Sequence, residues 1–154
     1  MGPPTMKLTL QEFETQLARM EARLVPELYI ALQRIGEATQ DVARAMPGVE
    51  HSFWPPLAES TIEDKMRKGF PVPSPLRRTG EMAESYKYEL RPGELAVAVG
   101  SEEKTALFHE FGTSRMPPRP VLSRAMMEIL PFARRMLGSV ANSILTGRPE
   151  KLLP

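Results

Sequence analysis

A single apolar stripe near the start of the chain sets the strongest limit on the fold. Between residues 10 and 42 the apolar positions recur at alternating spacings of three and four, the period of one helix face. They are Leu10, Phe13, Leu17, Met20, Leu24, Leu28, Ala31, Ile35, Ala38 and Val42. Thr9 and Glu12 have capping-box spacing, and Pro47-Gly48 closes the far end. The pattern predicts a helix over residues 10–46, about 55 Å long.

The predicted helix is longer than a small domain is wide. Pro26 lies inside it, where it removes one backbone hydrogen bond, and is expected to kink the rod or divide it in two. The stripe fits two interpretations, the core-facing side of an antiparallel helix or the seam of a coiled coil. The core interpretation is favoured, because a three-four spacing also describes ordinary amphipathic helices.

The rest of the pattern predicts a small sheet and a second helix. Residues 86–90 alternate apolar with polar, residues 91–94 have turn chemistry, and residues 95–100 read as a second strand, so a hairpin is expected. Further elements are an extended piece at residues 51–54, short helices at residues 60–68 and 104–111, a helical turn after Thr79-Gly80, and a helix at residues 123–145 capped by Ser123, with Pro131 near its first turns.

These elements predict one α+β domain over residues 1–154. The long N-terminal helix and the C-terminal helix pack on a small antiparallel β-sheet with short helical insertions. Residues 51–122 are expected to form a β-meander with a basic, Pro-rich loop, and residues 1–8 and 147–154 to be flexible ends. The open edges of so small a sheet, and a helix too long for its domain, favour association with other copies.

Composition and hydropathy argue against a disordered chain and against a membrane-spanning one. The 154 residues carry 20 Lys and Arg against 19 Asp and Glu, with 42% hydrophobic residues, as in soluble globular chains. No apolar stretch approaches the length of about 18 residues that a membrane span needs, and the start lacks a signal peptide's pattern, so a cytoplasmic protein without membrane contact is expected.

The sequence shows no pattern typical of an active site. There is no Cys and there are only two His, and His109-Glu110 lacks the second imidazole of a zinc-protease motif because position 113 is Thr. An imidazole packed at the end of a short helix and hydrogen-bonded locally is the expected alternative. No nucleophile elbow or phosphate-binding loop is present. We therefore expect no catalytic residue, no metal and no cofactor, with a metal-assisted hydrolase around His109 and Glu110 as the enzyme alternative.

A basic loop is the second candidate site. Residues 65–78 concentrate five positive charges without an acid, namely Lys65, Arg67, Lys68, Arg77 and Arg78. They are candidates for contact with DNA or with an acidic partner. The isoelectric point of about 8.1 and the absence of a groove-reading motif make specific nucleic-acid binding the lesser alternative, beside an ordinary solvated surface.

Five segments carry a resemblance to a known family. They are WPPLAESTIEDK at residues 54–65, PLRRTGEMAES at 75–85, VAVG at 97–100, FHEFGT at 108–113 and MPPRPVL at 116–122. In this order and with these gaps they resemble the tail-completion, or neck, proteins of tailed bacteriophages, a group that includes minor tail protein Z-like and virion-morphogenesis proteins. The resemblance covers residues 54–126. The long N-terminal helix and Val121, where an aromatic often stands, depart from the family pattern.

The resemblance implies a non-enzymatic virion protein that forms a ring of identical copies at the head–tail junction. It implies contact with tail-terminator and head-connector or portal-side proteins, non-specific contact with packaged DNA, and a location in the virion after assembly in the host cytoplasm. The assembly and partner-binding candidates are Trp54, Leu76, Thr79, Gly80, Phe108, His109, Glu110, Phe111, Gly112, Thr113, Pro118, Arg119 and Pro120.

The segment from Pro117 to Pro120 is expected to form a stiff extended arm, because three of its four residues are prolines. The backbone sets the direction of Arg119, which can reach a carboxylate or carbonyl of a neighbour. The alternative, equally open, is an arm folded onto its own domain.

Overall fold

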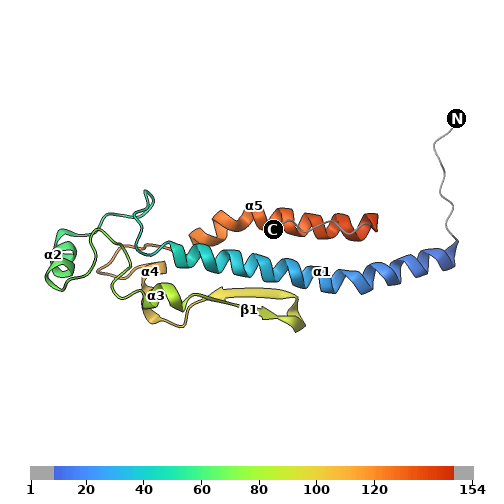
Figure 1. The fold of residues 1–154 in the computed structure, drawn as a ribbon, viewed down its shortest axis with the longest axis horizontal. Helices are drawn as coiled ribbons and strands as arrows, with labels where there is room; N and C mark the ends of the chain where they lie inside the picture. The colour runs from blue at the N-terminus through green and yellow to red at the C-terminus, as the bar shows by residue number, and fades with distance from the viewer. Residues whose placement is uncertain (1–8, 148–154) are drawn as a thin grey trace, which may run out of the picture.

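The computed structural model describes residues 9–147, and Figure 1 shows how their helices and strands are arranged. The elements are α1 (Leu10–Ala45), α2 (Glu59–Arg67), α3 (Glu81–Ser85), β1 (Lys87–Arg91), a 3₁₀ turn (Pro92–Glu94), β2 (Ala96–Gly100), α4 (Lys104–Phe111) and α5 (Leu122–Thr146). The predicted flexible ends, residues 1–8 and 147–154, lie outside the described residues except for Gly147, which ends α5.

The long helix α1 begins at the predicted capping box. The Thr9 hydroxyl accepts a hydrogen bond from the Glu12 amide at 3.2 Å, and the Glu12 carboxylate accepts one from the Thr9 amide at 2.8 Å. The helix runs unbroken through Pro26 to Ala45, so Pro26 does not divide it. In the same way α5 continues through Pro131, which lies well inside the helix and not in its first turns.

The two long helices and the hairpin form three layers. In Figure 1, α5 lies along one side of α1 and the hairpin along the other, so both helices are on one side of the sheet. Helix α5 runs antiparallel to α1, because Arg23 near the start of α1 donates a hydrogen bond to Ser143 near the end of α5 at 2.8 Å. The predicted α+β fold, with its two long helices and small antiparallel sheet, is confirmed.

Two buried clusters hold these layers together. One lies between α1 and α5 and consists of Ala31, Met136, Val140 and Ile144. The other joins the far end of α1 to the connecting segments and to the start of α5, and consists of Ala43, Met46, Trp54, Met82, Tyr86, Ala106, Val121 and Ala125. The second cluster fixes the loops that form the candidate site, because most of its members lie in or beside those loops.

The sheet is smaller than predicted. It consists of β1 and β2 alone, paired antiparallel from Lys87 opposite Gly100 to Arg91 opposite Ala96, so residues 51–122 form a hairpin with loops and short helices and not a meander. The prediction of an extended piece at residues 51–54 is also wrong. These residues form a turn in which the rings of His51 and Phe53 stack with centroids 4.9 Å apart and the Trp54 amide donates to the His51 carbonyl at 3.0 Å.

Helix α1 approaches the hairpin closely at Gly36. A Cβ at this position would lie 2.7 Å from a Val97 methyl group and 2.9 Å from the Tyr88 ring. We expect Gly36→Ala to lower the free energy of unfolding by about 1–2 kcal/mol, because the steric cost exceeds the gain in helix propensity. Gly138→Ala on α5 is the matched control, since no atom lies within 4 Å of its Cβ, and should raise stability by up to about 1 kcal/mol. Urea unfolding measures both, and a stabilised Gly36→Ala variant would contradict the close packing.

The first part of α1 extends beyond the end of α5. Met20 packs against the cluster that contains Ile144, close to where α5 ends at Thr146, whereas residues 10–19 are exposed. We call these ten residues the α1 overhang; at about 1.5 Å per residue they extend about 15 Å. Its apolar stripe is open to solvent, with Leu10 75%, Phe13 49% and Leu17 47% exposed. The stripe of α1 therefore faces the core only in its later part.

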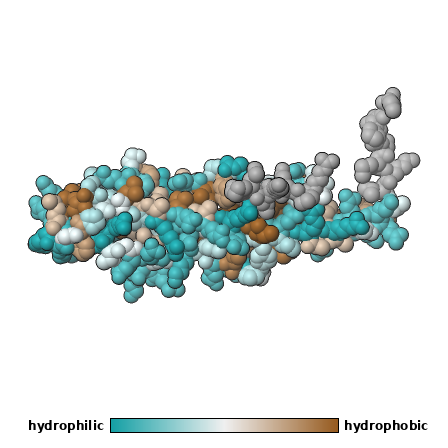
Figure 2. Space-filling model, viewed as in Figure 1, coloured by the Kyte–Doolittle hydropathy of each residue, from teal (hydrophilic) through white to brown (hydrophobic). Residues whose placement is uncertain are grey.

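The remaining surface is mixed in character. The face in Figure 2 is largely hydrophilic, and its hydrophobic side chains form separate small groups, one of them at the α2 end of the molecule. No helix within residues 9–147 combines the length and the apolar character needed to cross a membrane.

Candidate functional site

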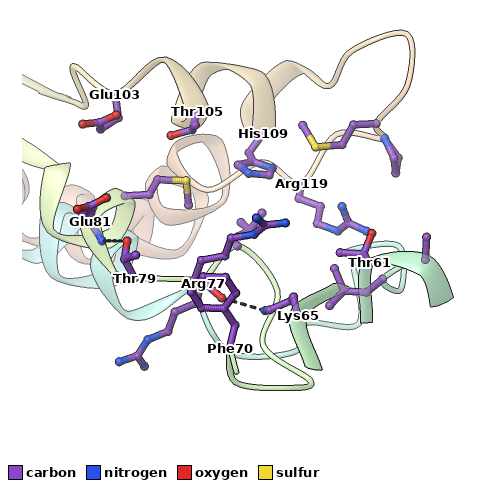
Figure 3. Close-up of a pocket in the computed structure, with 18 of the residues that line it drawn as sticks. Thr61, Lys65, Phe70, Arg77, Thr79, Glu81, Glu103, Thr105, His109 and Arg119 are labelled. Atoms are coloured by element: carbon purple, nitrogen blue, oxygen red, sulfur yellow. Dashed lines mark hydrogen bonds between the residues drawn. The ribbon is translucent and has the colours of Figure 1, made fainter. Parts of the chain in front are cut away.

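A cavity of about 870 Å³ opens at the end of the molecule that carries α2 (Figure 1). Its wall comes from α2, the following loop, the start of α3, α4 and the segment after α4 (Figure 3). We call it the basic cavity. It brings together eight of the residues singled out in the sequence, namely Lys65, Leu76, Arg77, Arg78, Thr79, Gly80, His109 and Arg119.

Lys65 fixes the Pro-rich loop to α2. Its side chain is only 3% exposed, and its ammonium group donates hydrogen bonds to the Ser74 carbonyl and, at 2.9 Å, to the Arg77 carbonyl. Burial, together with the nearby positive charge of Arg78, lowers the pKa of Lys65. Lys65 thus places an ammonium group without a carboxylate partner in the wall of the basic cavity.

Arg119 fixes the extended arm on its own domain. Its guanidinium is nearly buried and donates to the carbonyls of Pro55 at 3.1 Å and Pro56 at 2.8 Å. The Arg119 amide also donates to the His109 carbonyl at 2.7 Å, and the Trp54 indole donates to the Pro120 carbonyl at 3.1 Å. Of the two alternatives for the arm, the structure shows the folded one. Burial lowers the pKa of Arg119, which has no carboxylate partner among residues 9–147.

Most charges of the basic loop are paired locally. Asp64, one residue before the loop, forms ion pairs with Arg67, with Lys68 at 2.9 Å and with Arg78 at 3.3 Å. Hydrogen bonds from Lys68 and Arg67 lower the pKa of Asp64. The loop is therefore less positive at its surface than its sequence indicates, and this weakens the prediction of a DNA-facing contact.

The charges around the cavity are unevenly distributed. Five cationic side chains line it, Lys65, Arg77, Arg78, Arg115 and Arg119, against two carboxylates, Glu81 and Glu103. In Figure 3 the two carboxylates lie at one end of the cavity, while Lys65 and Arg119 lie at the other. Within the described part of the chain, Arg77 and Arg115 have no ion pair. The cavity therefore carries an excess of positive charge that an anionic group can balance.

His109 projects toward this cavity from α4 (Figure 3). Its Nδ1 is buried without a hydrogen-bond partner among residues 9–147, so the expected local hydrogen bond of this imidazole is not found there. Burial, and the positive charge of Arg119, lower the pKa of His109 and favour the neutral imidazole. Across residues 9–147, no three His, Asp or Glu side chains gather into a group that can hold a metal ion.

Glu110 does not line the cavity and serves as the cap of α5. Its carboxylate accepts hydrogen bonds from the amides of Val121 at 2.8 Å, Leu122 at 3.0 Å and Ser123 at 2.9 Å, and from the Ser123 hydroxyl. Burial raises the pKa of Glu110, but the hydrogen bonds from Ser123, Val121 and Leu122 outweigh it, so the pKa is lowered. The prediction that Ser123 caps this helix is wrong, because α5 begins at Leu122 and Ser123 is itself bound by Glu110.

The other predicted site residues take separate places. Trp54 is in the core, 6% exposed, whereas Phe108 and Phe111 on α4 are 47% and 75% exposed.

Gly112 ends α4 at φ +73°, and a Cβ there would lie 2.9 Å from the Met116 carbonyl oxygen. Thr113 pairs with Met116 in a short bridge, with Pro118 exposed and Pro120 partly buried behind it. Arg67 and Lys68 point to Asp64 and are not part of the cavity lining.

The sequence did not single out several residues of the cavity wall. Glu103 and Thr105 line it but lie outside every motif, and Thr61 lies within the segment 54–65 without being a named candidate. Only the folding of the chain brings these three residues together. Comparison of the chain with family models, with curated proteins and with solved structures finds no match.

Proposed function

We propose that this chain is a structural virion protein of a tailed bacteriophage. In this proposal it is a neck or tail-completion subunit that forms a homo-oligomeric ring at the head–tail junction. It acts in tail completion and head–tail joining by binding and not by catalysis. The observation that carries the proposal is the α1 overhang, whose apolar stripe has no partner within residues 9–147.

The exposed stripe supports association because its geometry is regular. Leu10, Phe13 and Leu17 follow the same helix face that is buried against α5 further along α1. Exposed apolar side chains that share one helix face can serve as an interaction site. The two-stranded sheet adds open edges, which other chains can pair with or cover.

Four of the five segments that resemble the phage family gather at the opposite end of the molecule, and the fifth, residues 97–100, lies in β2. Residues 54–65, 75–85 and 108–122 surround the basic cavity or support it through the hydrogen bonds of Arg119, Lys65 and Trp54. These hydrogen bonds restrain the loops of this end, which reduces the conformational entropy lost on docking. Tail-terminator and head-connector proteins are the partners we propose for the ring.

Removal of the protein from a phage that encodes it tests the proposal. Particles assembled without it should contain filled heads and tails that fail to join or to finish, and infectious titre should fall by several orders of magnitude. Supplying the wild-type chain from a plasmid is the control and should restore joined particles. Normal, full-length, infectious virions without this protein would remove the assignment.

A further inference from the structure

We propose that the basic cavity of one copy receives the α1 overhang of a second copy, so that copies associate head to tail. This inference rests on the self-association in the proposed function and specifies the two surfaces that meet. The contact joins an apolar helix stripe bordered by Glu14 and Glu21 to a cationic, partly apolar cavity.

The α1 overhang combines apolar and acidic side chains on one face. Within the overhang Glu14 lies four residues after Leu10, and just beyond its end Glu21 lies four residues after Leu17, so each carboxylate is next to the apolar stripe on the helix surface. Both glutamates are exposed, and neither forms an ion pair within residues 9–147. Glu12 is different, because its carboxylate is occupied by the capping box.

The cavity offers complementary chemistry. Its apolar lining includes Leu57, Phe70, Leu76, Met82 and Met116. Arg77 and Arg115 are exposed lining residues without an ion pair among the described residues, so their guanidinium groups are free to meet carboxylates. A volume of about 870 Å³ lies within the range of about 300–1,000 Å³ typical of ligand pockets, which suits the side chains of one helical turn and not a whole helix.

One copy cannot fill its own cavity with its own overhang. Figure 1 shows the start of α1 at one end of an elongated molecule and α2, α3 and α4 at the other. The contact must therefore form between copies. Two different surfaces meet in it, and repetition of such a heterologous contact closes into a ring when the rotation between copies allows.

Duplex DNA fits the cavity less well. A DNA surface needs exposed cations that follow the phosphate backbone, with bound counterions released on contact. Here Lys65 and Arg119 are buried and hydrogen-bonded to carbonyls, while Arg67, Lys68 and Arg78 pair with Asp64. An acidic protein segment, which brings its own apolar side chains, matches more of the lining.

Charge reversal on each surface tests the inference. The paired changes Arg77→Glu with Arg115→Glu, and Glu14→Arg with Glu21→Arg, should each weaken self-association by about tenfold or more in sedimentation velocity at low salt, because like charges then face each other. A 1:1 mixture of the two variants should assemble again, because each contact in it pairs opposite charges. Arg134→Glu with Arg135→Glu on α5 is the matched control and should assemble like the wild type.

A cross-link provides a second measurement that does not depend on weakened assembly. The chain contains no cysteine, so introduced thiols have no background. Glu14→Cys mixed with Arg77→Cys should give an oxidised heterodimer on a non-reducing gel, whereas Glu14→Cys mixed with Arg135→Cys should not. Absence of the first cross-link under conditions where the wild type assembles would overturn the inference.

The outcomes separate this inference from the proposed function. If both reversed variants assemble like the wild type, the proposed interface between the α1 overhang and the basic cavity is wrong. The proposed ring is then unaffected, because the copies associate through other surfaces. If Arg77→Glu with Arg115→Glu loses only DNA binding and keeps assembly, the cavity serves nucleic acid and the inference is again wrong. A wild-type chain that stays monomeric at all concentrations would remove both.

Discussion

Replacement of Arg119 by alanine is expected to lower the free energy of unfolding by about 3–5 kcal/mol. The guanidinium donates to the carbonyls of Pro55 and Pro56, and each hydrogen bond from a charged donor contributes about 1.5–3 kcal/mol. The alanine variant leaves both carbonyls without this donor. It also removes the side chain of a residue that is only 5% exposed. Urea unfolding of the purified chain measures the loss.

Two variants control for the charge. Arg119→Lys keeps the positive charge but lacks the planar fork that reaches two carbonyls at once, so it should recover only part of the stability. Arg115→Ala removes an exposed arginine from the same segment and should stay within about 0.5 kcal/mol of the wild type. An Arg119→Ala variant as stable as Arg115→Ala would show that the arm is not held by its arginine.

Replacement of Glu110 by alanine should lower the free energy of unfolding by about 2–4 kcal/mol. The change removes the acceptor for three backbone amides and one hydroxyl at the start of α5, and a negative charge at the positive end of the helix dipole. Glu110→Gln keeps one acceptor oxygen and loses the charge, so about half of that loss is expected. Glu128→Gln, on an exposed part of α5, is the control and should change little.

The Glu110 effect should depend on pH in one direction. The pKa of Glu110 is lower in the folded chain than in the unfolded chain, where it is about 4.3. The ionised carboxylate therefore stabilises the fold at pH values above this unfolded-state pKa. That contribution is lost as the pH falls through the folded-state pKa. The stability gap between the wild type and Glu110→Gln should therefore be full near pH 6 and shrink as the pH falls below about 4. A gap that widens on acidification would contradict this role for Glu110.

Local patterns in the sequence predicted the regular elements because their causes are local. The three-four stripe and the Thr9–Glu12 spacing define α1 to within a residue, and α4 has the predicted bounds Lys104–Phe111. The pattern of α1 did not show which part of its stripe is covered. That depends on where α5 ends, which is a property of the folded chain.

The contacts that shape the site could not be predicted from the sequence, because they join residues that are far apart in it. Arg119 reaches carbonyls more than sixty positions away, and Glu110 caps a helix that begins after an intervening loop. No spacing rule covers such pairs. The pairing of Asp64 with Arg67 and Lys68 is different, since these are i,i+3 and i,i+4 neighbours at the C-terminal end of α2. The spacing of these charges is visible in the sequence, where Asp64 stands one residue before the basic loop of residues 65–78.

The proposed function and the proposed interface both require the chain to assemble with copies of itself. Sedimentation velocity of the purified wild-type protein, across a range of concentrations and at low salt, resolves the monomer from any assembly. We expect one dominant closed species whose mass is a whole multiple, greater than one, of 17.3 kDa. A single species of 17.3 kDa at every concentration would contradict it.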